Sequence, residues 1–233
     1  MNWKKKSARD WERLGMTYKL RKVSEVIDEI AMGPFGSNIK VDCFVPSGVP
    51  VLNGSNLSGF VLSEDSFNYV TPQKAASLNK AVASRHDVVI THRGTLGQIV
   101  YIPENSKFER YVISQSQFRL RCNPDKMLPE FMVYFFHSRE GQYQLLSNSS
   151  QVGVPALARP SSTFQELQIP VPPIEDQQKI VGILTSLDAQ IAVNRRINHH
   201  LASTSAMDNS PDIRRGKRVS RKAVNVRDST ILA

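Results

Sequence analysis

The chain has 233 residues, of which 40% are hydrophobic and 22% are charged, a composition typical of a folded protein and unlike that of a disordered one. No apolar run approaches the roughly 20 residues that a membrane-spanning helix needs, and no apolar stretch follows the basic start of the chain, so we expect neither a membrane protein nor a secretory signal. Two cysteines, Cys43 and Cys122, are too few for a disulfide framework, which makes a reducing cytoplasm the default location.

The net charge of +9 is concentrated at the two ends of the chain. Residues 1–22 carry eight basic and two acidic side chains, and residues 201–233 carry seven basic and three acidic ones, whereas residues 23–200 are close to neutral. Excess basic charge is typical of proteins that bind nucleic acid, but basic ends are also often solvated tails. Charge alone leaves these two interpretations even.

The first two thirds of the chain predict an α+β domain. Residues 1–17 form a polar leader, and helical spacing of apolar residues predicts a short amphipathic helix over 18–31, ended by turn formers at 33–38. From 39 to 122, short β-branched runs alternate with turns, as in a compact, mostly antiparallel β domain. The predicted strands are Val49–Leu52, Phe67–Thr71, Val88–Thr91, Gln98–Ile102, Tyr111–Ser114 and Gln117–Arg121.

A second predicted helix follows the β region. It runs from Pro129 to Leu146, with a proline in its first turn and Gly141 as a point where it bends or divides. A polar loop over 147–153 and a short strand over Leu167–Val171 complete the domain, for which we predict the bounds 18–173.

The segment 174–202 predicts one long helix of the coiled-coil type, of which residues 174–201 span on the order of 40 Å. Steps of three and four residues define a seam made of Ile180, Leu184, Leu187, Ile191, Asn194, Asn198 and Leu201. A single helix cannot bury such a seam, so its partner is either another copy or another protein. The alternative is that the seam folds back on the β domain. Asparagines in the seam favour helix–helix pairing, because buried Asn selects register. Residues 203–233 are aperiodic and basic, and we predict a disordered tail there.

The sequence lacks the motifs of common enzyme classes. It has no phosphate-binding loop and no G-x-G-x-x-G, and Pro172-Pro173 is not set in an amino-methyltransferase motif. The histidines and cysteines have no metal-ligand spacing. His199-His200 fits the end of a helix better than a metal site, because positive charge is favourable there. These absences favour a binding protein.

Three polar loops have the residue types that contact DNA, where cations hold phosphates and polar side chains reach base edges. The candidate DNA-binding residues are Asn38 and Lys40 in the first loop, Arg93 and Thr95 in the second, and Ser149, Gln151 and the nearby Arg159 in the third. Each loop also has a structural interpretation: a helix-to-strand connection, a tight hairpin and a solvated loop. The near-neutral domain predicts weak DNA binding by this chain alone.

Across residues 20–201 the chain resembles the specificity (S) subunits of type I restriction–modification systems, in particular their first half. Each motif is loose, but their order and separations make a specific signal. The matching stretches are Leu20–Val23, Gly33–Ser37, Gly48–Leu52, Asn56–Leu57, Asp87–Gly97, Gln115–Leu120, Phe131–Ser138, Gly153–Leu157, Ile169–Ile174, Asp176–Val181 and Leu187–Ile191.

The resemblance implies a target recognition domain followed by a spacer helix. In the family two such halves are in tandem, each recognition domain reads one half of a split site on double-stranded DNA, and the long helices pack antiparallel. The subunit is non-catalytic, so no cofactor is expected on this chain. S-adenosylmethionine belongs to the modification (methyltransferase) subunits, and ATP and Mg²⁺ are expected on partner subunits, which include the restriction subunit. This sequence departs from the pattern by stopping after one helix.

Two functions from different classes follow. In the first, the chain is a half S subunit that reads one half-site, docks the methyltransferase subunits and pairs as a homodimer or with another S subunit. In the second, it is a truncated interaction protein that occupies modification subunits or a full S subunit without productive DNA reading. The recognised bases are not predicted, because the loops are the least family-like parts.

Overall fold

The computed structural model describes residues 18–34, 39–147, 149–150 and 153–208. The chain divides into two compact units, the first ending at Val181 and the second beginning at Gly182, and each is described by itself. The predicted polar leader, residues 1–17, and the part of the predicted tail over residues 209–233 lie outside the described residues.

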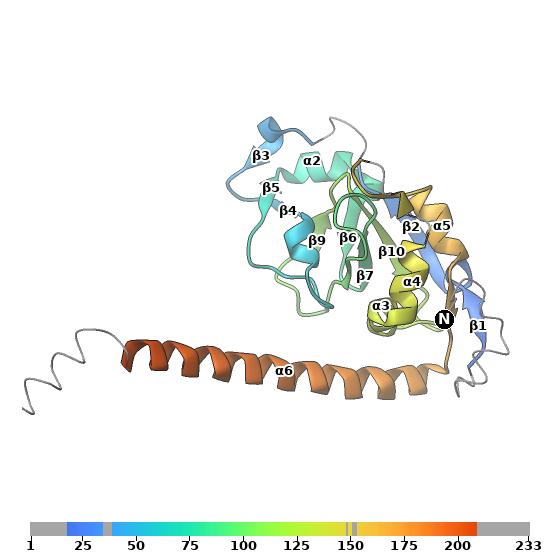
Figure 1. The fold of residues 1–233 in the computed structure, drawn as a ribbon. Helices are drawn as coiled ribbons and strands as arrows, with labels where there is room; N and C mark the ends of the chain where they lie inside the picture. Colours follow the sequence, from blue (N-terminus) through green and yellow to red (C-terminus); the bar gives the residue numbers. More distant parts are fainter. Residues whose placement is uncertain (1–17, 35–38, 148, 151–152, 209–233) are drawn as a thin grey trace, which may run out of the picture. The chain divides into compact units, whose positions relative to one another are not determined.

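A four-stranded antiparallel sheet forms the centre of the first unit, in the order β2-β10-β7-β8. Figure 1 labels three of its strands, β2, β10 and β7. The central strand β10 pairs with β2 on one side and with β7 on the other, so that Phe118 lies opposite both Met32 and Ile90. The bounds are β2 Ile27–Met32, β7 Asp87–Thr91, β8 Ile99–Tyr101 and β10 Gln117–Cys122.

The predicted helix over 18–31 is wrong. That segment forms strand β1 (Leu20–Lys22), a single 3-10 turn (Val23–Glu25) and the sheet strand β2. Its apolar spacing fits a helix, but a helix this short is marginal without tertiary contacts. Pairing with β10 along the sheet edge offers the β-branched residues a better site.

One face of the main sheet is covered by helices. The predicted helix over 129–146 is confirmed but consists of two helices, α3 (Pro129–His137) and α4 (Arg139–Leu146). They divide at Ser138, whose backbone is extended and whose hydroxyl accepts a hydrogen bond from Gly141 N at 3.2 Å. With α5 (Pro160–Glu166) they enclose the largest core, to which the sheet contributes Val88, Ile90, Ile99, Phe118 and Leu120, all with no exposed surface.

The other face packs on a second sheet of five strands, in the order β3-β5-β4-β9-β6. Val89 and Val100 of the main sheet meet Ala83 and Tyr111 of the second sheet in a separate core. Every strand pair in both sheets is antiparallel except β4 with β9. The bounds are β3 Phe44–Val45, β4 Val49–Val51, β5 Asn68–Val70, β6 Val82–Ser84 and β9 Arg110–Val112. The predicted α+β, mostly antiparallel domain is therefore confirmed.

Two short strand pairs join distant parts of the domain. Strand β1 pairs with β13 (Gln168–Pro170), the predicted strand before the long helix, and β11 (Ser149–Ser150) pairs with β12 (Ala156–Leu157). All six strands predicted between 39 and 122 are present within a residue or two. The short elements β3, β6, α5 and α2 (Pro72–Ser77) have no periodic signal long enough to be predicted.

The long helix α6 runs without a break from Ile174 to Asp208 (Figure 1), about 52 Å at the usual rise. It is longer than predicted, so the expectation of disorder is wrong for residues 203–208. Its first turns belong to the first unit, where Gln177 is fully buried and Ile180 packs against the main core. Ile180 is therefore partly used by its own domain, which the seam prediction did not include.

Among the helices that the structure describes, none combines the length and the apolar character that crossing a bilayer requires.

Candidate nucleic-acid interface

Several connections meet at one end of the main sheet, where β2 and β7 end and β10 begins. Thr91 lies opposite Gln117, and the backbone continues from there into loops on all three strands. Gly33 N donates to Gln117 O at 2.8 Å, and His92 N donates to Ser116 O at 2.9 Å. We call residues 33–40, 92–98, 113–117 and 149–157 the interface loops, of which 33–34, 39–40, 149–150 and 153–157 are the described parts of the first and last.

The first interface loop depends on a close backbone approach. A Cβ added at Gly33 would lie 1.9 Å from the carbonyl oxygen of Ser114, so only glycine fits against the 113–117 turn. That turn is closed by the buried Gln117, whose Oε1 accepts from Ser114 N at 2.9 Å. The glycine of the Gly33-Pro34 pair therefore fixes where the chain leaves β2 beside the 113–117 turn.

The turn between β7 and β8 is rigid although its tip is exposed. Gly94 and Gly97 have φ values of 91° and 87°, a conformation that side chains disfavour. Gln142 of α4 donates from Nε2 to Gly97 O at 2.9 Å, and Gln98 donates to Gly54 O at 3.0 Å. The helices and the 3-10 turn at Gly54–Leu57 thus hold the base of the turn, and Arg93 and Thr95 are exposed at its tip.

The structure brings the second and third predicted loops together. Arg93 forms a backbone bridge with Ala156, Gly94 N donates to Pro155 O at 2.8 Å, and Leu157 N donates to His92 O at 2.9 Å. Ser149 pairs with Leu157 on the neighbouring strand. Arg93 and Ser149 therefore belong to one continuous backbone network, which their separation in the sequence gave no means to foresee.

The remaining predicted DNA-binding residues have varied positions. Lys40 is exposed just before a 3-10 turn over Val41–Cys43, and Arg159 is exposed with a left-handed backbone (φ 46°) directly before α5. Asn38 and Gln151 lie outside the described residues. The DNA-binding role of all seven residues stays a prediction.

Sequence reasoning did not single out two polar residues at this end, Gln115 and His92. Gln115 is exposed between β9 and β10, and its carbonyl oxygen accepts from His92 Nε2 at 3.2 Å. Burial, with a further contribution from the charge of Arg93, lowers the pKa of His92. The His92 imidazole is therefore a neutral hydrogen-bond donor, and its bond to the carbonyl oxygen holds Gln115 in position. The available signal was the polar run Ser-Gln-Ser-Gln over residues 114–117, where one predicted strand ends and the next begins.

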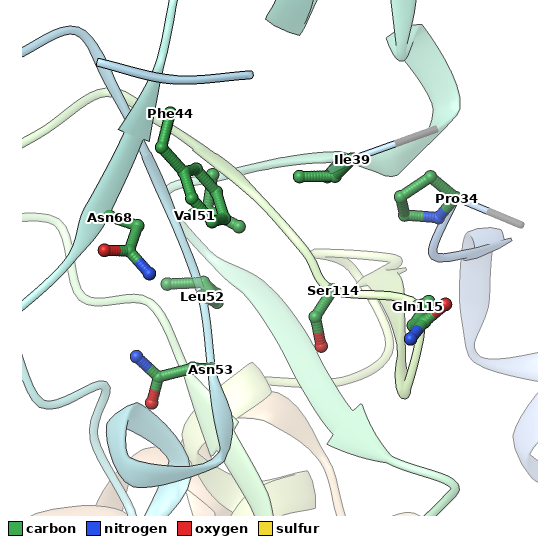
Figure 2. Close-up of a pocket in the computed structure, with 9 residues that line it drawn as sticks. All are labelled: Pro34, Ile39, Phe44, Val51, Leu52, Asn53, Asn68, Ser114 and Gln115. Carbon is green, nitrogen blue, oxygen red and sulfur yellow. The ribbon is translucent and has the colours of Figure 1, made fainter. Parts of the chain in front are cut away.

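A cavity of about 200 Å³ opens beside these loops (Figure 2). Ile39, Phe44, Val51 and Leu52 give it an apolar wall, and amide and hydroxyl groups stand around it. Figure 2 shows Asn53 and Asn68 on one side of the apolar residues and Ser114 and Gln115 on the other. Such a mixture suits contact with a flat, polar-edged group such as a nucleobase. No group of acidic, histidine or cysteine side chains in the described part of the chain could hold a metal ion.

A family model described as the type I restriction modification DNA specificity domain matches residues 37–203. The chain belongs to this family. The specificity subunit of the HindI type I restriction enzyme from Haemophilus influenzae is 29% identical over 103 residues, which cover 43% of this chain and 22% of that protein.

Several solved structures have a similar fold. A chain from a study of complex assembly and conformational transition of a type I R-M system matches with a TM-score of 0.58 and 22% identity, covering 79% of this chain and 41% of that one. The HsdS subunit from Thermoanaerobacter tengcongensis matches with a TM-score of 0.53 and 21% identity, covering 77% and 39%. The S subunit from M. genitalium also scores 0.53, at 16% identity, covering 83% and 46%. The chain described here therefore spans less than half the length of each of these three matched chains.

The second unit carries the predicted helix seam. Among the seam residues, Leu187, Ile191 and Leu201 are between 47% and 61% exposed, Asn194 and Asn198 are exposed, and Leu184 is half-buried. Ile183 and Ile197 extend the same apolar face. The pairing role of the seam stays a prediction.

Proposed function

We propose that this chain is a non-catalytic DNA sequence-specificity subunit of a type I restriction–modification system. It reads one half-site with the interface loops and docks the methyltransferase subunits. The observation that carries the proposal is the convergence of polar loops at one end of the sheet in a chain of the DNA specificity family. A cytoplasmic location belongs to the same proposal.

Each interface loop has a distinct part in reading DNA. Arg93 is exposed on a rigid turn and can donate two parallel hydrogen bonds to guanine, whereas the amide of Gln115 can both donate to and accept from adenine. Lys40, Thr95 and Ser149 suit phosphate oxygens, which position a protein without specifying sequence. Because a duplex is read by groups held in fixed positions, the rigid base of the 92–98 turn supports this role.

The helix seam pairs with a second helix, from another copy or from another S subunit. A stripe of half-exposed Leu and Ile on one face of α6 is costly in water and is typical of a helix that has a partner. Asn194 and Asn198 fix the register of the pair. Two copies related by a two-fold axis would present identical domains to the two halves of a palindromic split site.

We assign the cofactors of the reaction to the partner subunits. Methyl transfer uses S-adenosylmethionine on the modification subunits, and ATP and Mg²⁺ act on the restriction side of the complex. This chain contributes sequence choice and position, in agreement with the absence of enzyme motifs from its sequence.

The decisive experiment is sequencing of methylated positions in DNA treated with the modification subunits, with and without this chain. We expect site-specific methylation only when the chain is present. Arg93→Gln should alter or abolish the methylated motif, and Lys19→Gln, the same loss of charge on an exposed residue before β1, should not. Loss of a full S subunit's activity on adding this chain would instead support the truncated interaction protein.

Helix pairing is tested by light scattering. Leu187→Asp introduces a charge into the seam and should reduce the mass to that of one chain. Val193→Asp changes an equally exposed apolar residue (54%, against 50% for Leu187) outside the seam and should leave the paired mass unchanged. A single-chain mass for the wild type would remove the pairing proposal without affecting DNA reading.

A further inference from the structure

A second polar cavity lies away from the interface loops. It has a volume of about 390 Å³ and is bordered by helix α2, strands β6 and β9, and the far end of β10. Three of its lining residues are Arg110, Arg119 and Arg121, and Asn79 and Ser84 add further polar groups. None of the described residues that line it is acidic. We call this cavity the arginine cleft.

Two of the three arginines are held in place by a buried carboxylate. Asp87 has no exposed surface, and it accepts from Arg121 Nε at 2.8 Å and from Arg121 Nη2 at 3.1 Å. Its Oδ2 also accepts from Ser84 N at 2.9 Å and lies 3.5 Å from Arg119 Nη1. Fixed guanidinium groups lose little conformational freedom when they bind a ligand.

Arg119 is the structural member of the group. Only 6% of its side chain is exposed, and it donates to both carboxylate oxygens of Glu29, at 2.7 and 3.2 Å, and to Lys80 O at 3.2 Å. Arg119 hydrogen-bonding lowers the pKa of Glu29, which keeps that carboxylate ionised. These bonds occupy most of the Arg119 donors and leave its charge at the wall of the cleft.

Arg110 and Arg121 retain donors for a ligand. Arg110 is exposed on β9, and among the described residues none hydrogen-bonds to its guanidinium or to Nη1 of Arg121. With Lys80, which acts on Glu29, the local charge is four cations against the three carboxylates of Asp87, Glu29 and Asp28. Excess positive charge around a cavity with free guanidinium donors is complementary to a doubly charged oxyanion.

The cleft is separate from the interface loops. Gln117 begins β10 at the interface end, and Arg121 lies four residues further along the strand, about 13 Å away at the usual rise. The pairing of Arg121 with Asp87, the first residue of β7, places the cleft at the opposite end of that strand from Thr91. A ligand in the cleft therefore does not occupy the sites of Arg93 or Gln115.

We propose that the arginine cleft binds a phosphate group. The planar guanidinium fork matches phosphate oxygens, and Arg110 and Arg121 supply it from two strands. The phosphate comes either from a DNA backbone or from a free nucleotide. Only the DNA source rests on the proposed function.

Phosphate binding is measured first with inorganic phosphate and the full-length chain, by following the arginine Nε–H signals in NMR spectra. We expect saturable shifts of the Arg110 and Arg121 signals, and affinity about tenfold weaker in Arg110→Gln, which removes a charge-assisted bond. Lys19→Gln is the matched control and should bind as the wild type does. Absence of saturable shifts, or equal affinity in Arg110→Gln, would overturn the proposal.

Arg110→Gln avoids the folding problem of the other two residues, since Arg110 makes no bond to the buried Asp87. Its far-ultraviolet circular dichroism and denaturation midpoint should match those of the wild type.

The salt dependence of duplex binding then identifies the source of the phosphate. If a backbone phosphate occupies the cleft, Arg110→Gln reduces the slope of log K against log salt by about one. An unchanged slope together with lost phosphate binding assigns the cleft to a free nucleotide. If the wild type binds no duplex even together with the modification subunits, the proposed function fails, and the inorganic phosphate titration still decides the cleft.

Discussion

The two units of this chain bury apolar side chains by different means. In the domain, Val88, Phe118 and Leu120 have no exposed surface, because the main sheet and three helices enclose them. On the helix beyond Gly182, Leu187 and Ile191 are 50% and 47% exposed. The same residue types therefore stabilise the domain from within, whereas on the helix they can contribute fully only when a second helix covers them.

This difference separates folding from assembly in the same chain. A core substitution in the domain should change the free energy of unfolding, and a seam substitution should change the association constant. Variants that violate this division would show that the helix belongs to the folding unit of the domain.

The largest expected effect is the difference in the free energy of unfolding between Leu120→Ala and Leu187→Ala. Removing the buried Leu120 side chain leaves a cavity and should lower the free energy of unfolding by about 2–5 kcal/mol. Leu187→Ala should change it by less than about 0.5 kcal/mol at protein concentrations where the chains are unpaired. Urea denaturation measures the first effect, and light scattering over a concentration series measures the loss of pairing. A large stability loss for Leu187→Ala in unpaired chains would contradict the division.

The first turns of α6 belong to the domain, and a substitution of the buried Gln177 tests how much they contribute to its stability. Its Nε2 donates to Lys126 O and Pro172 O at 2.8 and 2.9 Å, and its Oε1 accepts from Leu128 N at 2.9 Å. Gln177→Leu removes all three bonds and should cost about 1–3 kcal/mol, because buried backbone groups lose their partners.

The neighbouring Gln178 supplies the control for this substitution. Gln178 is exposed, and Gln178→Leu should stay within about 0.5 kcal/mol of the wild type in the same urea titration. Equal effects of the two substitutions would mean that the amide network does not anchor the helix.

Local sequence signals predicted much of this fold, and tertiary contacts determined the rest. The strands with β-branched runs, the helical character of 129–146 and the long helix are where their residues indicated. Residues 18–31 were misassigned because their apolar spacing fits a helix, while the pairing of β2 with β10 depends on residues about 90 positions away. Ser138 divides the helix by its own capping bond, which periodicity does not report.

The candidate interface was predictable as residue types but not as an arrangement. Polar turns at 92–98 and 147–153 could be found by inspection, whereas the bridge from Arg93 to Ala156 required the fold. The arginine cleft was not predictable at all, because Arg119 and Arg121 read as ordinary alternating strand residues until Asp87 is placed opposite Arg121 and within reach of Arg119.

A pH titration tests the interface end of the domain. Burial and Arg93 lower the pKa of His92 below 6.5 in the folded state, so the unfolded chain binds the proton first as pH falls. This group's contribution is therefore fully present above pH 6.5 and is lost as pH falls through the folded-state pKa. We expect the free energy of unfolding of the wild type to fall below pH 6.5 by more than that of His92→Gln, measured by urea titrations between pH 7 and 5. Parallel pH profiles for the two proteins would contradict the buried, neutral histidine.

The smallest effect concerns the glycine at the junction of the two units. Gly182 lies inside α6, its φ is not positive, and an added Cβ would meet no atom within 4 Å. Gly182→Ala should therefore stabilise the helix by about 0.5–1 kcal/mol, because alanine loses less backbone entropy on folding. Gly141→Ala is the opposite case, since its Cβ would lie 2.2 Å from Phe135 O, and it should destabilise the domain by about 1–3 kcal/mol. Thermal unfolding followed by circular dichroism distinguishes the stabilisation expected for Gly182→Ala from the destabilisation expected for Gly141→Ala. A stability loss in Gly182→Ala would contradict the open space around this position.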